Sequence, residues 1–203
     1  MQACGCGVLA QTAVVIDERD MTLGTDLLSG DDVAGWYWSE KLDGVRAYWD
    51  GAQLWTRSGR CVALPAELAA CLPAFPVDGE IWAGRGNLPS AVAAANHGRW
   101  VPGIQFKGFD TPAVRGPWPK RLAHVAAHLP PGGWASAVEH GIVADMAHLA
   151  RIFREVRAAG GEGLMLRYPR ALYYQRCRTR HLLKVKVDPA PGLVGLARRV
   201  LAA

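Results

Sequence analysis

Short apolar runs bounded by turn residues dominate the chain from residue 36 onward. Runs rich in aromatic and branched side chains predict strands, which we place at residues 36–39, 45–49, 77–82, 104–109, 163–167 and 182–187. Asp50-Gly51 stands between the second of these runs and residues 54–56. Because Asp-Gly is a preferred two-residue turn, it predicts a hairpin at this point.

Helical spacing is clearest after Asp145. The apolar residues at i, i+3, i+4 and i+7, the period of one helix face, are Leu149, Ile152, Phe153 and Val156. The pair Gly160-Gly161 predicts the end of this helix. We place shorter helices at residues 66–72, directly after Pro65, at 90–95 and at 120–129.

These elements predict one α+β domain with mainly antiparallel sheets. The strands come in pairs with helices between them, and regular strand–helix alternation is missing. We assign residues 31–187 to this domain. Residues 1–30 have weak periodicity and form a peripheral N-terminal lead-in, and residues 188–203 form a short C-terminal tail.

The composition is that of a globular chain with a basic C-terminal part. Half of the 203 residues are hydrophobic, a fifth are charged, and the formal net charge is +5. Acidic residues outnumber basic ones up to residue 50, and basic residues dominate from residue 151. Such a surface suits a polyanion, with a solvated charged face as the alternative.

Sequence signals of membrane and secreted proteins are missing. No apolar run approaches the roughly 20 residues needed to cross a bilayer, and residues 1–13 lack the basic flank of a secretory leader. The five cysteines show no paired Cys-x-x-Cys spacing, which argues against a zinc site or a disulfide framework. We expect no membrane partner and a cytoplasmic location; a periplasmic location stays open if the N-terminus is a processed leader.

The candidate chemistry centres on Lys41, in the sequence Ser39-Glu40-Lys41-Leu42-Asp43-Gly44-Val45-Arg46. Its predicted place is the short connection between two strands. A free lysine, with a pKa of about 10.4, is protonated at neutral pH and cannot attack an electrophile. Burial or neighbouring cations lower that pKa and make a lysine nucleophilic. The alternative is an ordinary surface turn, since Asp-Gly favours turns.

Further charged and aromatic residues follow Lys41 in order, each close to a predicted strand. They are Thr56-Arg57-Ser58-Gly59, Asp78-Gly79-Glu80, Phe109-Asp110, Glu162-Gly163 and Lys184-Val185-Lys186. Residues two apart on a strand face the same side, so Lys184 and Lys186 would both point into one groove. Two cations on one wall suit a triphosphate.

This ordered series, from about Trp38 to Val187, resembles the motifs of the covalent nucleotidyltransferase superfamily of DNA ligases, RNA ligases and capping enzymes. Three segments most resemble the small bacterial ATP-dependent DNA ligases: residues 38–51, 78–86 and 160–186. The resemblance implies an ATP-grasp-like adenylation domain, with ATP as AMP donor and Mg²⁺ or Mn²⁺ as metal. The implied reaction seals nicked double-stranded DNA through lysyl-AMP and DNA-adenylate intermediates.

The resemblance also implies a role for each matching residue. Lys41 would attack the α-phosphate of ATP, and Phe109 would stack on adenine, with a core phenylalanine as the alternative. Glu80 would contact the ribose or the metal, and Glu162 would bind the metal. The remaining nucleotide-binding residues would be Glu40, Arg46, Arg57, Lys184 and Lys186.

Alternatives remain for several of these residues. Arg46 could instead form a structural ion pair with Asp43 or Asp50, and one of the two late lysines could be a surface residue. Arg57, Arg85 and Arg178 are candidates for DNA contact, the last two on weaker matches. Cys177 stands where those ligases have glycine, so the turn before Arg178 is expected to differ.

The resemblance fails at two places. Residues 88–104 match poorly, and the residues after Lys186 are too few for the OB-fold barrel that follows the last motif in these ligases. We therefore expect the adenylation domain alone, as a monomer, with a separate OB-fold or DNA-binding partner as one source of the missing part. An RNA ligase, a capping-type enzyme and a non-catalytic nucleic-acid-binding relic are the alternative functions.

Overall fold

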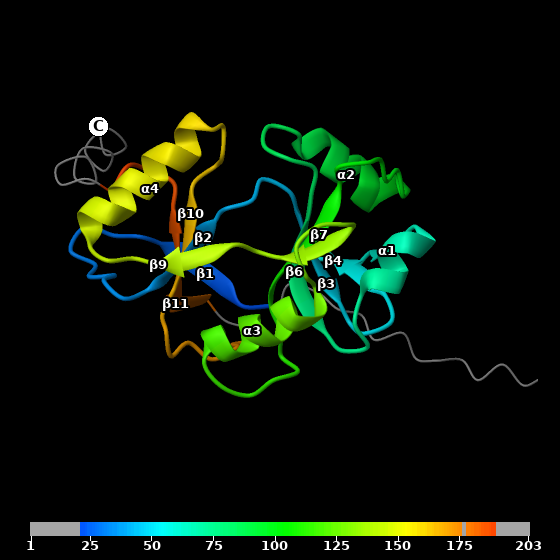
Figure 1. Cartoon of the computed structure of the whole chain (residues 1–203), viewed down its shortest axis with the longest axis horizontal. Helices are drawn as coiled ribbons and strands as arrows, with labels where there is room; N and C mark the ends of the chain where they lie inside the picture. The colour runs from blue at the N-terminus through cyan, green and yellow to red at the C-terminus, as the bar shows by residue number, and fades with distance from the viewer. Residues whose placement is uncertain (1–20, 176–177, 190–203) are drawn as a thin grey trace, which may run out of the picture.

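The computed structural model, which describes residues 21–175 and 178–189, contains two β-sheets that face each other (Figure 1). One sheet has five strands in the order β1-β11-β10-β2-β9, and the other has six in the order β5-β4-β3-β6-β7-β8. Neighbouring strands are antiparallel except for β1–β11 and β7–β8. The predicted α+β class with antiparallel-rich sheets is confirmed.

The strands of the five-stranded sheet come from both ends of the described chain. They are β1 (Leu23–Asp26), β2 (Tyr37–Glu40), β9 (His140–Ile142), β10 (Leu164–Arg167) and β11 (Arg178–Val185). The six-stranded sheet consists of β3 (Val45–Trp49), β4 (Leu54–Thr56), β5 (Cys61–Val62), β6 (Val77–Trp82), β7 (Gln105–Asp110) and β8 (Ala135–Ala137).

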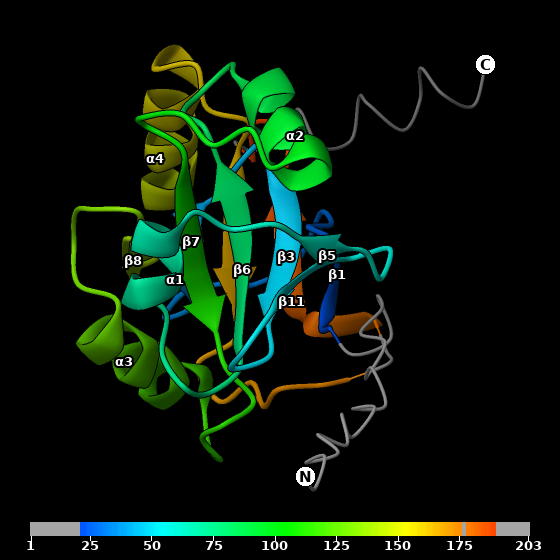
Figure 2. The same cartoon turned by 90° about the vertical axis from the view of Figure 1, so that its right-hand side faces the viewer.

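In the described ranges, four helices pack against this pair of sheets. The helices are α1 (Ala66–Cys71), α2 (Leu88–His97), α3 (Trp118–His128) and α4 (Met146–Ala158). Helix α4 lies beside the five-stranded sheet, and α1 and α2 lie on the far side of the six-stranded sheet (Figures 1 and 2). No helix in the described ranges is both long and apolar enough to cross a bilayer.

Each sheet has its own hydrophobic core. The predicted apolar face of α4 is buried against residues of β10 and β11 such as Leu164 and Leu183. Asp145 starts this helix by accepting a hydrogen bond of 2.7 Å from the backbone N–H of His148, which satisfies one of the free donors of the first turn. The second core lies between the six-stranded sheet and α1, α2 and α3, with Phe106 and Ile81 fully buried.

The chain crosses from one sheet to the other between β2 and β3. These strands are consecutive in sequence but belong to different sheets. The crossover is residues 41–44, so Lys41 lies where the chain passes between the sheets. The prediction that Lys41 connects two strands is confirmed, although the sequence does not reveal that the strands lie in separate sheets.

Three details differ from the sequence prediction. Leu23–Asp26 pairs with the last strand, so the domain begins before residue 31; residues 1–20 of the predicted lead-in lie outside the described ranges. The last strand starts earlier than predicted and ends at Val185, which leaves Lys186 beyond it. The short strands β5, β8 and β9 were not predicted, and most of the predicted tail, from residue 190, is also outside the described ranges.

Candidate active site

A cavity of about 260 Å³ lies between the two sheets at the crossover. It is lined by charged residues and by a smaller set of apolar ones, all within the described part of the chain. The charged residues are Glu40, Lys41, Arg46, Arg57, Glu80, Arg167, Arg178 and Lys184. The others are Leu23, Gly24, Ser39, Leu42, Phe109, Val138, Met165 and Leu182.

Strand register explains why these side chains converge. In the five-stranded sheet Met165 lies opposite both Ser39 and Lys184, so the three form one row across β2, β10 and β11. In the six-stranded sheet Arg46 lies opposite Glu80. Directly opposed residues project from the same face of a sheet. Each sheet therefore presents one row of functional side chains to the cavity.

Lys41 is held beside Glu162 by both backbone and side-chain contacts. Its backbone N–H donates a hydrogen bond of 2.8 Å to the carbonyl of Gly163, and its Nζ donates to Glu162 Oε2. The side chains are 19% and 29% exposed, so a ligand in the cavity can reach the amine. Two residues 121 positions apart are thus brought together at the crossover.

Arg46 is paired with a buried aspartate from the neighbouring strand. Its Nε and Nη2 donate to the two oxygens of Asp78 at 3.1 and 2.7 Å. Asp78 also accepts a hydrogen bond of 3.0 Å from the hydroxyl of Tyr173. The sequence suggested Asp43 or Asp50 as the structural partner of Arg46; the partner is Asp78, because β3 pairs with β6 and places this side chain beside it.

Glu80 carries an electrostatic conflict. Its Oε1 accepts a hydrogen bond of 3.1 Å from the backbone N–H of Gly44. Burial raises the pKa of this carboxyl to about 7, although the nearby charges of Lys41 and Arg46 act in the opposite direction. Without a ligand, therefore, the carboxyl is only partly ionised near neutral pH.

Phe109 and Met165 supply apolar walls from opposite sheets. Phe109 is on β7 of the six-stranded sheet, and Met165 is on β10 of the five-stranded sheet. The guanidinium carbons of Arg46 and Arg167 lie 5.4 and 5.3 Å from the centroid of the Phe109 ring. A flat ligand ring could pack between the aromatic ring of Phe109 and the thioether of Met165.

Three of the predicted residues do not line the cavity: Arg85, Lys186 and Glu162, the last of which contacts it only through Lys41. Arg85 forms a two-point ion pair with Glu40, at 2.8 and 2.7 Å, and lines an adjacent cavity with Trp82 and Lys107. Lys186 is exposed and follows the end of β11. Lys184 lines the cavity and Lys186 does not, so the structure brings only the first of the two predicted lysines into this space.

Arg57 and Arg178, both predicted, line the cavity, and so does Arg167, which was not predicted. Arg178 donates a hydrogen bond of 3.0 Å to the carbonyl of Gly24, and Arg57 also lines a more open hollow with Ser58 and Arg60. Arg167 and Met165 had no predicted site role. Their spacing of two within a predicted strand was a usable signal, because it places them on one face.

Glu80 and Glu162 are the carboxylates available for a metal ion. Among the described residues no group of three or more His, Cys, Asp or Glu side chains could hold a metal by itself. Mg²⁺ is commonly bound by one or two carboxylates together with substrate phosphates and water. These two glutamates fit that kind of shared site, and burial raises the pKa of Glu80 even though Lys41 and Arg46 lie nearby, so a bound cation would favour its ionised form.

Comparisons with known proteins agree with this geometry. Residues 109–186 match the family model described as the ATP dependent DNA ligase domain. A DNA ligase of Haemophilus influenzae is 36% identical over 158 residues, which are 76% of this chain and 59% of the relative. The chain thus spans 59% of the length of that relative.

Solved structures of DNA ligases share the fold. A structure of a Lig E DNA ligase has a TM-score of 0.71 and 29% identity, over 81% of this chain and 68% of that one. The Chlorella virus DNA ligase-adenylate has a TM-score of 0.68 and 20% identity, over 82% and 68%. The chain is thus similar to ATP-dependent DNA ligases over residues 109–186, and its fold is that of the nucleotidyltransferase domain in solved DNA ligase structures.

Proposed function

We propose that this chain transfers AMP from ATP to Lys41 and then to the 5′-phosphate of a nicked DNA strand. The observation that carries the proposal is the position of Lys41 Nζ beside Glu162, in a cavity that also holds Glu80, Arg46 and Lys184. A nucleophile, an adjacent carboxylate and several cations around one cavity are the groups that nucleotidyl transfer needs.

In the first step the lone pair of Lys41 Nζ forms a bond to the α-phosphorus of ATP. The bond from that phosphorus to the bridging oxygen of the β-phosphate breaks, and pyrophosphate leaves with the electron pair. The ammonium group must lose two of its three protons, one to free the lone pair for attack and a second to give the neutral phosphoramidate nitrogen, which keeps one hydrogen; the second proton leaves to solvent. Glu162 already accepts a hydrogen bond from Nζ, so it is placed to receive the first proton.

The other cavity residues hold the nucleotide. Lys184, Arg46 and Arg57 supply positive charge for the phosphates, and an arginine can donate two hydrogen bonds to one phosphate. The purine ring fits between Phe109 and Met165, which supply the apolar walls. Glu40 and Glu80 are the carboxylates available to accept hydrogen bonds from the base or ribose.

Glu80 and Glu162 would share a divalent cation with the phosphate oxygens. Bound Mg²⁺ or Mn²⁺ would supply charge neutralisation for the leaving pyrophosphate. Glu162 would then release Lys41 at least in part, since the amine and the cation compete for the same carboxylate.

DNA would enter on the side of the arginines. Arg57 faces both the nucleotide cavity and the open hollow lined by Ser58 and Arg60, which suits a residue that contacts AMP and the DNA 5′-phosphate in turn. Arg178 lines the cavity at the start of β11. In the sealing steps the 5′-phosphate oxygen attacks the AMP phosphorus and releases Lys41; the 3′-hydroxyl then displaces AMP.

A labelling experiment tests the first step. The chain is incubated with ATP labelled at the α-phosphate and Mg²⁺, and covalent label is followed on a denaturing gel. We expect label on the wild-type chain and on Lys120→Ala, an exposed lysine of α3, and no label on Lys41→Ala. Label on Lys41→Ala at the wild-type level would rule out Lys41 as the acceptor.

Substrate choice is tested separately from the first step. Nicked DNA that already carries a 5′-adenylate is offered in parallel with nicked RNA of the same sequence, and GTP competes with ATP in the labelling. We expect the chain to seal the nicked DNA and not the nicked RNA. In the labelling assay we expect unlabelled ATP, and not unlabelled GTP, to reduce the covalent label. Sealing of RNA alone would favour the RNA ligase, and labelling by GTP alone the capping-type enzyme.

A further inference from the structure

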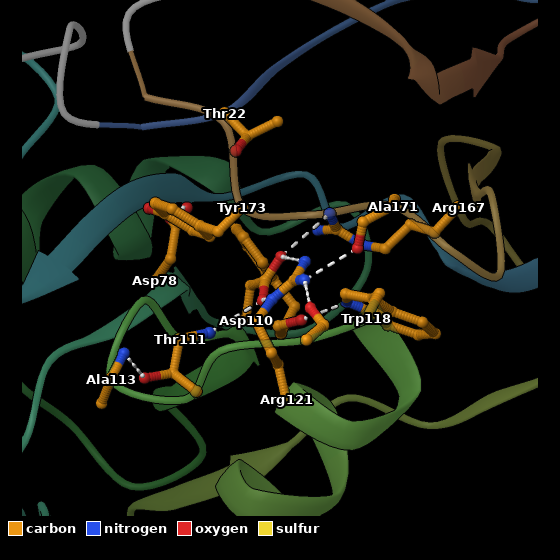
Figure 3. A network of polar contacts seen from close by, with 12 residues as sticks. Thr22, Asp78, Asp110, Thr111, Ala113, Trp118, Arg121, Arg167, Ala171 and Tyr173 are labelled. Carbon is orange, nitrogen blue, oxygen red and sulfur yellow. Dashed lines mark hydrogen bonds and ion pairs between the residues drawn. The ribbon is translucent and has the colours of Figure 1, made fainter.

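A buried network of charged side chains joins the two sheets behind the cavity (Figure 3). Its centre is Asp110, at the end of β7, which is 1% exposed. Arg121 reaches this carboxylate from α3, and Arg167 reaches it from β10 of the opposite sheet. The Arg167–Asp110 ion pair is therefore a direct link between the sheets, one residue away from Phe109.

Arg121 has the contacts expected of a structural ion pair. It donates to both oxygens of Asp110, at 2.7 and 3.1 Å, from Nε and Nη2. Its Nη1 donates to the carbonyls of Gly116 and Ala171 at 2.6 and 2.7 Å. Its guanidinium group is thus bonded on every nitrogen, which offsets the cost of burying the charge.

Arg167 is buried to a similar depth but is paired much less completely. Its contact to Asp110 is a single one, Nη1 to Oδ2 at 3.4 Å. Its Nε is buried without a hydrogen-bond partner among the described residues, and burial lowers the pKa of its guanidinium group. Breaking or weakening the pairing of a buried charge is costly, so stability of the fold alone does not account for an arginine at this position.

Its surroundings connect Arg167 to both apolar walls of the cavity. Its guanidinium carbon lies 5.3 Å from the ring centroids of both Phe109 and Trp118. Arg46, from the other sheet, also lies near the Phe109 ring. Along β10, Arg167 is two residues after Met165, and both line the cavity. The Arg167 side chain thus contacts the Phe109 ring and lies on the same face of β10 as Met165.

We propose that Arg167 is a positioning residue that sets the spacing and orientation of Phe109 and Met165, the two walls between which the purine base binds. This inference rests on the proposed function, because it takes the ligand to be a nucleotide. Arg167 acts through Asp110 and the Phe109 ring and does not itself react. Its loss lets the sheets and the ring relax, so the base binds less well while the chemistry at Lys41, once ATP is bound, proceeds.

The test is the ATP dependence of Lys41 labelling in Arg167→Met, which keeps the length of the side chain and removes the charge. We expect the KM for ATP to rise by at least about tenfold, with the rate at saturating ATP within about threefold of wild type. Arg167→Lys keeps the charge, so its KM for ATP should lie between those of wild type and Arg167→Met. Should Arg167→Met fail to fold, a KM increase of about threefold or more in Arg167→Lys carries the same test.

A double-mutant cycle with Phe109→Leu asks whether Arg167 acts through the ring. We expect Phe109→Leu to raise the KM by itself, and Arg167→Met to add less than about threefold to it. Ile152→Val is the control for a general loss of stability, because Ile152 is buried in α4 and does not line the cavity. Its KM should equal that of wild type even though its melting temperature is lower.

Two results would overturn the inference. The first is a KM for ATP within about twofold of wild type in an Arg167→Met protein that folds and becomes labelled. The second is a double variant whose KM increase equals the product of the increases in Arg167→Met and Phe109→Leu, which would show that the two residues act independently. An unlabelled wild-type chain is a different outcome, since it contradicts the proposed function itself. Covalent labelling of the wild-type chain therefore distinguishes a failure of the Arg167 inference from a failure of the proposed function.

Discussion

At the scale of single residues, Glu80 illustrates how burial of a carboxyl in the cavity wall opposes stability. The carboxyl lies in the wall of the cavity, and burial raises its pKa from 4.5 to about 7. A group whose pKa is higher in the folded state favours folding when protonated. Its contribution to stability is complete below pH 4.5 and is lost as the pH rises through about 7.

Glu80→Gln should therefore change how stability depends on pH. The amide stays neutral, so the variant avoids the penalty of ionisation, on the order of 3 kcal/mol at pH 8. Denaturant unfolding of the metal-free protein at pH 5 and pH 8 measures this. We expect the variant to gain stability over wild type at pH 8 and little at pH 5; an equal difference at both pH values would contradict the shifted pKa. AMP transfer should fall in the same variant.

At the scale of elements, the crossover between β2 and β3 depends on close packing at Gly44. A Cβ atom at this position would lie 2.3 Å from the carbonyl oxygen of Ile81 and 2.9 Å from Cγ of Glu80. Real side chains do not tolerate such distances, so the crossover must move if a methyl group is added. Lys41 and Glu80 would both be displaced.

Gly44→Ala should consequently lower both stability and activity. We expect a loss of about 1–3 kcal/mol from overpacking and a fall in AMP transfer of about tenfold or more from the displaced amine. Asp145→Ala is the matched control, because it removes the cap of α4 at a cost of about 1 kcal/mol and lies away from the cavity. Unfolding curves and labelling rates of both variants, measured together, separate the effects; a normal labelling rate in folded Gly44→Ala would count against the account.

The sequence was informative where an element depends on local pattern. Val45–Trp49 and Val77–Trp82 have the predicted bounds, and α4 has the predicted buried face. By contrast, Leu23–Asp26 becomes a strand by pairing with residues more than 150 positions later, which no local pattern reveals.

Within the site, the ordered motifs located Lys41 and the residues around it, since their types and spacing carry the resemblance. The network of Asp110, Arg121 and Arg167 depends on contacts between sheets and could not be predicted. Lys186 lies beyond the last strand because that strand ends at Val185, two residues earlier than predicted.

At the scale of the whole molecule, a net positive charge and arginines around the cavity favour binding to a polyanion. Binding that neutralises phosphates releases counterions, so the affinity falls as the salt concentration rises. This dependence is a property of the entire binding surface, and single arginines contribute to its slope.

Affinity for nicked duplex DNA, measured by fluorescence anisotropy over a range of salt concentrations, tests this. We expect Arg178→Ala to weaken binding and to reduce the log–log slope by about one. Arg151→Ala should change neither, because Arg151 is exposed on α4 and paired with Glu155. Equal slopes for wild type and Arg178→Ala would place this arginine outside the DNA contact.

We propose that the amine of Lys41, held at the crossover between the sheets, accepts AMP. The most direct test of this proposal is mass spectrometry of the chain after incubation with ATP and Mg²⁺, followed by proteolysis to locate the modified peptide. We predict the mass of one added AMP, carried by the peptide that contains Lys41 and lost on incubation with pyrophosphate. AMP on a different residue, or no adduct with ATP under any metal condition, would contradict it.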